Sequence, residues 1–498
     1  MYAKVKTAIL NGYQGKIIEI ESAMTAGLPS FSIIGLADTV VKESTERIRA
    51  SLKYYKISLP PKRIIVNLSP AGIRKSGAHL DLSIVVTLLE QLNVSKFTPD
   101  RTCSFLGELT LDGKILPLNG VLVLLETLRQ EGVKKVVLPM KNYEEATYIE
   151  GIEFIPVQNL QDVMAYVCEG TIPVYDFKVD EKVLEKTKSY MDYENVKGQE
   201  GAKRALTIAL SGHHNLLLIG PPGTGKTMLL KNAASLLAPL TLDEGIEVAK
   251  IYSASNRDGL DFIKYRQPHF RAPHHSIGRS ALIGGGHKPQ PGEIALAHRG
   301  VLFLDELGEF KTEQLEQLRE PLENREMTIS RLGQHVTYPT DFILLAAMNP
   351  CKCGYYGSSL KTCTCAPSVV SRSLSKLSKP LLDRIDMIFW VNDVDVKTLS
   401  GKESINGATS KQLKRIIEDT QNELFKINQC NKILEMSNKA EDTLAKGYQK
   451  LELSPRTYNK VIALSQTIAV MEGSEHIESI HVLEALQYRK IESLFGGV

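Results

Sequence analysis

The stretch of sequence that decides the fold is NLLLIGPPGTGKT, residues 215–227. Its four apolar residues, 216–219, predict a buried strand that ends at Gly220. The glycine-rich loop that follows closes with Gly225, Lys226 and Thr227, and a helical pattern continues from 228 to 237. A strand, a loop of the form G-x-x-x-x-G-K-T and a helix predict a phosphate-binding loop, because backbone N–H groups of such a loop surround an anion.

Each residue type in this loop has a chemical task. Lys226 is expected to reach the β- and γ-phosphates of ATP, and the Thr227 hydroxyl is expected to bind Mg²⁺. Glycines allow the backbone to approach the phosphates closely. The residues expected to bind the nucleotide are Gly220, Pro221, Pro222, Gly223, Thr224, Gly225, Lys226 and Thr227.

Two further strand ends supply the partners that this chemistry needs. The sequence GVLFLDE, residues 300–306, predicts a neighbouring buried strand that ends in two carboxylates. Asp305 is expected to hold Mg²⁺, and Glu306 to polarise the attacking water. A third apolar run, 342–348, ends at Asn349, which either positions that water or caps the next loop.

Composition sets the broad class. A chain of 498 residues with 43% hydrophobic and 23% charged residues predicts two or three globular domains. The net charge of +3 is too small to indicate a nucleic-acid or membrane partner by itself. No apolar run is long enough to cross a membrane, and no secretory signal is evident at the first residues. Seven cysteines in a long chain favour reduced thiols, so we expect a cytoplasmic protein without a membrane partner.

Residues 1–170 predict a separate α/β domain. Strands are expected at 5–9, 15–20, 31–34, 62–68 and 133–139, helices at 40–52, 80–92 and 121–130, and a hairpin over 107–117. Its segments NLSP (67–70), GELTLDGKILPLNGVL (107–122) and VKKVVLPMKN (133–142) resemble the proteolytic domain of Lon-type proteases. That family uses a Ser–Lys dyad, but His79 and Leu122 stand at the matching positions, so a docking or oligomerisation role is favoured over proteolysis. Residues 171–195 are charged and aperiodic and predict a linker.

Residues 262–292 form a basic segment, which we call the insertion. It contains no Asp or Glu, and its basic residues are Lys264, Arg266, His269, Arg271, His274, His275, Arg279, His287 and Lys288. Contact with a phosphate backbone is one interpretation. A solvated or interface loop and a histidine metal site at 274–275 are the others. A hairpin expected after residue 324 adds Arg325 and Arg331, which could face the same polyanion.

Four cysteines lie close together after Asn349. Cys351, Cys353, Cys363 and Cys365 predict either a Cys₄ zinc site or a group of reduced, redox-sensitive thiols. The C-x-C spacing is tighter than the usual C-x₂-C, which weighs against a single Zn²⁺ ion. Both interpretations stay open on the sequence.

Several segments together resemble the ComM/YifB family of magnesium-chelatase-like AAA+ ATPases. They are VKGQEGAKRAL (196–206), GHHNLLLIGPPGTGKT (212–227), FRAPHHSIGRSALIGGG (270–286), GVLFLDELGEF (300–310), AAMNPCKCG (346–354), PLLDRID (380–386) and LSPRTYNKVIALSQTIA (453–469). The resemblance covers nearly the whole chain. One departure is SKLSK at 375–379, where relatives usually carry Ser-Gly before the proline.

The resemblance implies both a fold and a set of site residues. The fold is α/β, with a Lon-protease-like domain lacking the dyad at 1–170, an AAA+ P-loop ATPase core at 196–395 and a helical lid at 396–498, where helices are expected at 411–430, 439–451, 455–471 and 480–494. Gly198 and Gln199 would line the adenine site, and Asn349 would be the sensor-1 residue. Arg384 would be an arginine finger for a neighbouring subunit, and Arg456, just after Ser454-Pro455, would be sensor 2.

The resemblance also implies a function. It predicts a hexameric ring that uses ATP and Mg²⁺ to drive branch migration of single-stranded or branched DNA, supporting recombination during natural transformation. Two other classes stay open: a magnesium-chelatase-like ATPase that remodels a protein partner for metal insertion, and a scaffold without enzymatic activity. Stimulation of ATP turnover by DNA separates the first class from the other two.

Overall fold

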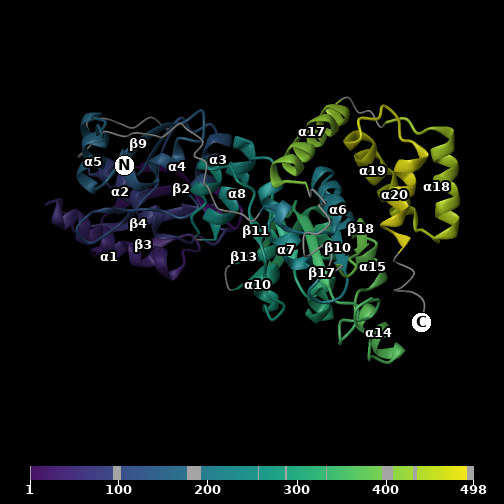
Figure 1. Ribbon diagram of the computed structural model, residues 1–498. Coiled ribbons are helices and arrows are strands. Elements are labelled where there is room, and N and C mark those ends of the chain that lie inside the picture. The colour runs from purple at the N-terminus through teal and green to yellow at the C-terminus, as the bar shows by residue number, and fades with distance from the viewer. Residues whose placement is uncertain are drawn as a thin grey trace. The chain divides into compact units, whose positions relative to one another are not determined.

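The computed structural model describes residues 2–92, 102–175, 192–255, 257–286, 289–331, 334–394, 408–429 and 434–490. The chain divides into two compact units. The first combines Met1–Leu184 with Gly245–Lys264, and the second combines Glu185–Glu244 with Tyr265–Val498. The segment Gly245–Lys264 therefore groups with the first unit, whereas the sequence predicts an ATPase core that spans 196–395 without a break. Figure 1 shows the elements of both units along the colour scale.

The first unit contains two main sheets. One has the order β1-β2-β4-β3, in which only β3 and β4 run parallel, and the other has the parallel order β5-β8-β9. The hairpin predicted around an Asp-Gly turn is β6 and β7, with Gly113 at φ +77°. The strands are β1 (Tyr2–Asn11), β2 (Gln14–Thr25), β3 (Ser30–Ile34), β4 (Arg63–Ser69), β5 (Cys103–Phe105), β6 (Glu108–Leu109), β7 (Ile115–Leu116), β8 (Lys135–Pro139) and β9 (Glu153–Val157). The helices are α1 (Thr39–Tyr54), α2 (Asp81–Gln91), α3 (Val121–Gln130), α4 (Tyr143–Ala146), α5 (Leu160–Met164), α8 (Leu242–Ala254) and α9 (Leu260–Lys264), the first three residues of α8 belonging to the second unit.

The second unit is built on a five-stranded parallel sheet of order β11-β14-β17-β10-β18. These strands are β10 (Leu216–Ile219), β11 (Phe270–Arg271), β14 (Val301–Leu304), β17 (Ile343–Met348) and β18 (Met387–Trp390). Both faces are buried, because Leu216 and Leu218 pack in one hydrophobic cluster and Leu217 and Ile219 in another. The predicted α/β class is confirmed, and the structure shows that the sheet of this unit is parallel.

Two details of the sequence analysis are corrected here. The strand before Asp305 is not a direct neighbour of β10, since β17 lies between them. The helix expected over 312–322 is two helices, α12 (Thr312–Glu316) and α13 (Arg319–Asn324). Pro321 explains the break, because in a continuous helix its ring would clash with the carbonyl of Gln317. The helix expected over 228–237 is likewise α7 (Lys226–Lys231) followed by a 3₁₀ turn.

The remaining elements of the second unit surround this sheet or follow it. The helices are α6 (Glu200–Ser211), α10 (Arg279–Ile283), α11 (Glu293–Leu296), α14 (Pro367–Leu374), α15 (Lys379–Leu382), α17 (Ser410–Gln429), α18 (Asn438–Lys450), α19 (Pro455–Met471) and α20 (Ser479–Gln487). Short antiparallel pairs join β12 (Gly284–Gly285) to β13 (Gln290–Pro291), and β15 (Glu326–Arg331) to β16 (Gln334–Pro339).

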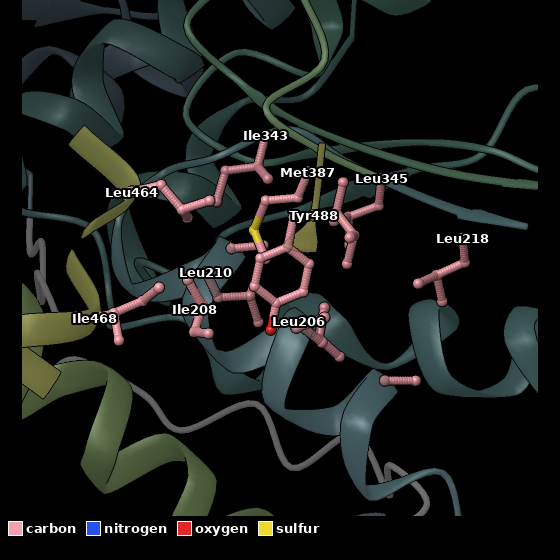
Figure 2. Close-up of a cluster of buried hydrophobic side chains, with 14 of the residues drawn as sticks. Leu206, Ile208, Leu210, Leu218, Ile343, Leu345, Met387, Leu464, Ile468 and Tyr488 are labelled. Carbon is pink, nitrogen blue, oxygen red and sulfur yellow. The ribbon is translucent and has the colours of Figure 1, made fainter. Parts of the chain in front are cut away.

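The C-terminal helices share a core with the parallel sheet. Ser454 caps α19 by accepting a hydrogen bond from the Thr457 N–H at 3.2 Å, as the Ser-Pro signal predicts. Figure 2 shows side chains of α6, of three sheet strands and of α19 packed together, with Tyr488 among them: Leu206, Ile208, Leu210, Leu218, Ile343, Leu345, Met387, Leu464, Ile468 and Tyr488. Within the described residues, none of the helices has the length and apolar character needed to cross a bilayer.

Candidate functional site

The phosphate-binding loop lies between β10 and α7. Gly223 and Gly225 adopt left-handed backbone angles, with φ of +79° and +85°, which explains why glycine is required there. Gly220 is required for space instead, because a Cβ atom on it would lie 2.2 Å from the carbonyl oxygen of Val391. The backbone therefore takes the shape expected of a phosphate cradle.

A cavity of about 340 Å³ opens over this loop. It is lined by Pro222, Gly223, Thr224, Gly225, Lys226, Thr227, Met228, Asp305, Glu306, Met348 and Asn349. The carboxyl ends of β10, β14 and β17 thus meet at one edge of the sheet, where ligands bind in open α/β folds. Gly220 and Pro221 are not in contact with this cavity, although they shape the loop behind it.

Lys226 is folded back onto its own loop. Its ammonium donates hydrogen bonds to the carbonyl oxygens of Gly220 at 2.7 Å and Pro221 at 2.6 Å, and it lies 3.4 Å from Asn349 Oδ1. Burial lowers the pKa of Lys226 to about 8, and the negative charges of Asp305 and Asp393 oppose that shift. A phosphate group would have to draw the ammonium away from these carbonyls.

The two carboxylates after β14 have different surroundings. Asp305 is half-buried and accepts a hydrogen bond from the Glu306 N–H at 3.0 Å. Glu306 has left-handed backbone angles, φ +50° and ψ +47°, and its side chain is 54% exposed. Together with the Thr227 hydroxyl, the Asp305 carboxylate offers the oxygen ligands that Mg²⁺ prefers.

Gln199 contacts the phosphate-binding loop outside the cavity. Gly198 and Gln199 both have positive φ, at +70° and +63°. The Gln199 amide donates hydrogen bonds to the carbonyl oxygens of Asn392 at 2.7 Å and Thr224 at 3.3 Å. Gln199 therefore joins the segment after β18 to the loop, and neither Gly198 nor Gln199 lines the cavity.

Arg384 and Arg456 meet outside the cavity. Arg384 donates to the carbonyl oxygens of Arg319 at 3.0 Å and Pro380 at 2.6 Å, and it forms an ion pair with Glu323. Arg456 Nη1 lies 2.9 Å from the other carboxylate oxygen of Glu323. Hydrogen bonds from these arginines, that from Arg384 first, lower the pKa of Glu323. One carboxylate on α13 thus holds both arginines that were expected to reach a γ-phosphate.

The four cysteines converge as a metal site requires. The Sγ atoms of Cys351, Cys353 and Cys363 are 3.4 to 3.7 Å apart, and all four sulfur atoms, that of Cys365 included, lie within 4.8 Å of one another. Zinc bound to four sulfurs at about 2.3 Å places those sulfurs about 3.8 Å apart. The C-x-C spacing therefore does not prevent a tetrahedral arrangement.

The cysteine loop also packs on the nucleotide site. A Cβ atom on Gly354 would lie 2.7 Å from the Pro222 side chain, so the two loops are in close contact. Burial raises the pKa of Cys351, whereas backbone N–H groups of Tyr355 and Thr364 lower the pKa of Cys353.

The insertion is more ordered than its composition indicates. Arg271 forms a two-pronged ion pair with Glu293 at 2.5 and 2.6 Å, and Lys264 pairs with Glu144 within the first unit. Burial lowers the pKa of His269 to about 3, which leaves this side chain neutral. Arg279 is exposed at the start of α10. His287 and Lys288 lie outside the described residues, as does the side chain of Arg331 on the hairpin.

The positions that match the Lon dyad are both in the core of the first unit. His79 is 8% exposed and its Nε2 lies 3.1 Å from the carbonyl oxygen of Ala8. Leu122 is fully buried in α3. His79 has no hydroxyl nucleophile, and Leu122 cannot accept a proton, so the two positions do not form a catalytic dyad.

Sequence reasoning missed two contacts of the site. His275 Nδ1 lies 3.2 Å from Glu306 Oε2, and Glu323 holds Arg384 and Arg456. The Pro-His-His signal at 273–275 could have pointed to the first contact, but it was interpreted as polyanion contact, as a solvated or interface loop, or as a metal site. No local pattern marks Glu323, because its partners come from distant parts of the chain.

Comparison with known proteins adds independent findings. Three family models match the chain: magnesium chelatase, subunit ChlI, over residues 192–399; subunit ChlI of Mg-chelatase over 20–142; and magnesium chelatase, subunit ChlI C-terminal, over 397–489. The chain is 37% identical to the competence protein ComM of Haemophilus influenzae, over 97% of this chain and 96% of that protein. It is 36% identical to the protein YifB of Escherichia coli, over 98% and 97% of the two chains. Lon protease 2 of Bacillus subtilis is 26% identical over 32% of this chain and 31% of the protease.

Proposed function

Since the chain belongs to the ComM/YifB family of magnesium-chelatase-like AAA+ ATPases, we propose that it is an ATP-hydrolysing ring motor that acts on DNA. The proposed work is branch migration of single-stranded or branched DNA, in support of homologous recombination of incoming DNA. The name of the relative ComM, a competence protein, supports a role in natural transformation. A homo-oligomer, most simply a hexamer, is the proposed active form.

The observation that carries the hydrolytic part is the cavity in which a phosphate-binding loop, two carboxylates and an asparagine meet. In the proposed reaction Lys226 binds the β- and γ-phosphates and Glu306 takes a proton from the attacking water, which Asn349 orients. Thr227 and Asp305 would hold Mg²⁺, which neutralises the developing phosphate charge when bound.

The two arginines complete the proposal. An arginine finger, which neutralises the charge of the transition state, must reach the γ-phosphate. Neither Arg384 nor Arg456 lines the cavity of this chain. Arg384 is therefore proposed to serve the cavity of a neighbouring subunit. For Arg456 the proposal is the sensor-2 role, released from Glu323 when the lid moves.

DNA contact is proposed for the exposed part of the insertion and for the β15–β16 hairpin. Arg279, which is exposed, is the described cation best placed for a phosphate backbone. Arg325 is 67% exposed but lies 3.4 Å from Asp341 Oδ1, so a phosphate would have to compete with that carboxylate for it. Arg271 contributes less than its charge suggests, because Glu293 already neutralises it. The first unit, without a dyad, is proposed as a docking or assembly domain.

A second function is favoured by a different observation. The three matching family models describe magnesium chelatase subunits, which supports a motor that remodels a protein partner for metal insertion. ATP turnover with and without branched DNA separates the two, with the Glu306→Gln protein as the blank. The DNA motor predicts faster turnover with DNA. A rate of ATP turnover that does not change with DNA favours the remodelling function. If the assembled protein does not hydrolyse ATP at all, both proposed functions are rejected.

The cysteine cluster is proposed to bind one structural Zn²⁺ ion. The support is the sulfur geometry: three Sγ atoms are 3.4 to 3.7 Å apart and all four lie within 4.8 Å of one another, close to the spacing of about 3.8 Å in tetrahedral zinc sites. Elemental analysis of the purified protein should find one equivalent of zinc per chain, and the paired variant Cys353→Ser/Cys363→Ser should lose it. The variant Cys103→Ser, which removes a buried thiol far along the chain, serves as the control. Protein that contains no zinc and takes up none would favour the redox-thiol interpretation.

A further inference from the structure

The cysteine loop, residues 351–365, touches the phosphate-binding loop directly. Its four thiols stand near its two ends, so a metal held by them would tie those ends together. Gly354 packs on Pro222, which lines the nucleotide cavity, and a Cβ atom on Gly354 would lie 2.7 Å from the Pro222 side chain. Gly354 also has a φ of +83°, which favours glycine. The cysteine loop thus meets the phosphate cradle at a point where no side chain fits between the two.

The same loop also holds the segment that follows β18. Ser358 Oγ donates a hydrogen bond to Asp393 Oδ2 at 2.7 Å, and the Ser359 N–H donates to the same oxygen at 2.8 Å. Gly357 packs on Trp390 at the end of β18, where a Cβ atom on Gly357 would lie 2.5 Å from the indole ring. The middle of the cysteine loop is therefore fixed to the end of β18 and to the residues just after it.

The segment after β18 is in turn connected to the phosphate-binding loop. The Gln199 amide donates to the carbonyl oxygens of Asn392 at 2.7 Å and Thr224 at 3.3 Å, which joins the two segments. Burial lowers the pKa of Lys226, and the negative charge of Asp393 opposes that shift, so Asp393 acts electrostatically on the ammonium. A displacement of the cysteine loop would therefore change the phosphate-binding loop and the surroundings of its lysine together.

We propose that the metal bound by the four thiols sets the affinity for ATP, with Asp393 as the positioning residue that connects the cysteine loop to the phosphate-binding loop. This inference rests on the proposed function, because it assumes the zinc site and the ATP site proposed above. Without a metal, no bond would hold the four thiols within 4.8 Å of one another, and the cysteine loop would lose its anchor. Zinc that raises the affinity for ATP must, by linkage, be bound more tightly itself when ATP is present.

The test uses Trp390, the single tryptophan of the chain, as a reporter. Its ring packs against Gly357 and Tyr356, so its emission should shift to longer wavelength when a zinc-selective chelator frees the loop, and return when zinc is added back. ATP is titrated into zinc-loaded and zinc-free protein, both carrying Glu306→Gln to prevent hydrolysis. The Kd for ATP should be about tenfold higher without zinc, a factor typical of coupling between two sites. Zinc affinity, measured by competition with the chelator, should rise by the same factor when ATP is bound.

The variant Asp393→Ala separates the hydrogen bonds of Asp393 from its charge. It removes the acceptor of Ser358 and Ser359 but leaves all four thiols, so it should still bind one equivalent of zinc. Loss of a negative charge near the phosphates would by itself strengthen ATP binding. A Kd for ATP that instead rises by about fivefold in the zinc-loaded variant identifies the lost connection, and the effect of zinc on that Kd should shrink toward none. Asp442→Ala, at an exposed position of α18, is the matched control and should change neither affinity.

Each result bears on one part of the proposal. Equal affinity of the zinc-loaded and zinc-free proteins for ATP would overturn it and leave the zinc site intact. Zinc-loaded Asp393→Ala that binds ATP as tightly as the parent, or more tightly, would overturn the role of Asp393. Protein that takes up no zinc would reject the zinc site itself, and this coupling with it. If chelation unfolds the protein, the zinc-loaded Asp393→Ala protein still decides, by whether its Kd for ATP rises.

Discussion

At the scale of the residue, we expect Lys226 to couple nucleotide binding to pH. Burial lowers its pKa to about 8, while bound phosphates would favour the charged ammonium. Binding in alkaline solution must therefore take up a proton. We expect the Kd for ATP to rise about tenfold from about pH 7 to about pH 9, as linkage with a free-state pKa of about 8 requires.

The measurement is nucleotide titration of the Glu306→Gln protein, which removes hydrolysis. Lys226→Arg in the same background is the matched variant, because a guanidinium stays charged across the whole range. Its Kd should be weaker but independent of pH. A parallel rise in both proteins would mean that another group titrates and that Lys226 is charged throughout.

How far the sequence predicts the site depends on where the contacts of each residue come from. Lys226, Thr227, Asp305 and Asn349 were predictable because each follows an apolar strand, and strand ends meet at one edge of a parallel sheet. Glu323 was not, because its two arginine partners lie 61 and 133 positions away along the chain (384 minus 323 and 456 minus 323). Such contacts depend on tertiary packing, which no local pattern encodes.

At the scale of the element, the periodicity of apolar residues located the long helices and strands along the sequence. It did not predict which strands lie next to one another in the sheet. The helix α19 follows a Ser-Pro signal and matches the expected 455–471, whereas the order of the sheet could not be read from the chain. Short apolar strands give no pairing information, so β17 was not expected between β10 and β14. Pro321 was visible in the sequence, and giving it more weight would have predicted the break between α12 and α13.

The helix α8 provides an element-scale prediction. Within the first unit, Ser253 on α8 accepts a hydrogen bond from the Gly120 N–H at 2.9 Å and lies 3.3 Å from Glu145 Oε1 on α4. Burial raises the pKa of Glu145 from its ordinary 4.5 to about 7. A carboxyl whose pKa is higher in the folded state destabilises the fold increasingly as the pH rises from 4.5 to 7, and the cost is constant above that range.

Glu145→Gln should therefore stabilise the protein most at neutral and alkaline pH. The full pKa shift corresponds to about 3 kcal/mol, and the partial exposure of the side chain reduces the expected gain to about 2 kcal/mol above pH 7. Thermal unfolding of parent and variant across this pH range should show a gap that closes toward acid. Glu150→Gln, at an exposed position of the same unit, is the control. A gap of constant size would show that ionisation of Glu145 is not its cause.

At the scale of the whole molecule, we propose that a single chain does not form a complete hydrolytic site. Arg384 is only 11% exposed and rests on Glu323 together with Arg456, and neither arginine lines the cavity that holds Lys226 and Glu306. A transition state at that cavity would lack its arginine unless another copy of the chain supplied it. Closed rings of identical subunits provide this arrangement at every interface.

Mixing two inactive proteins tests this arrangement. Lys226→Ala cannot bind phosphate in its own cavity but keeps Arg384, whereas Arg384→Ala keeps its cavity but offers its neighbour no finger. Each alone should be nearly inactive, and an equal mixture that reassembles at random should regain about one quarter of the parental ATP turnover, because one interface in four then pairs an intact cavity with an intact finger. A mixture of Lys226→Ala with Glu306→Gln should regain nothing, since both changes damage the same half of the interface. If the first mixture also stays inactive while it assembles normally, Arg384 does not act on a neighbouring subunit, and the ring is not required to complete the site.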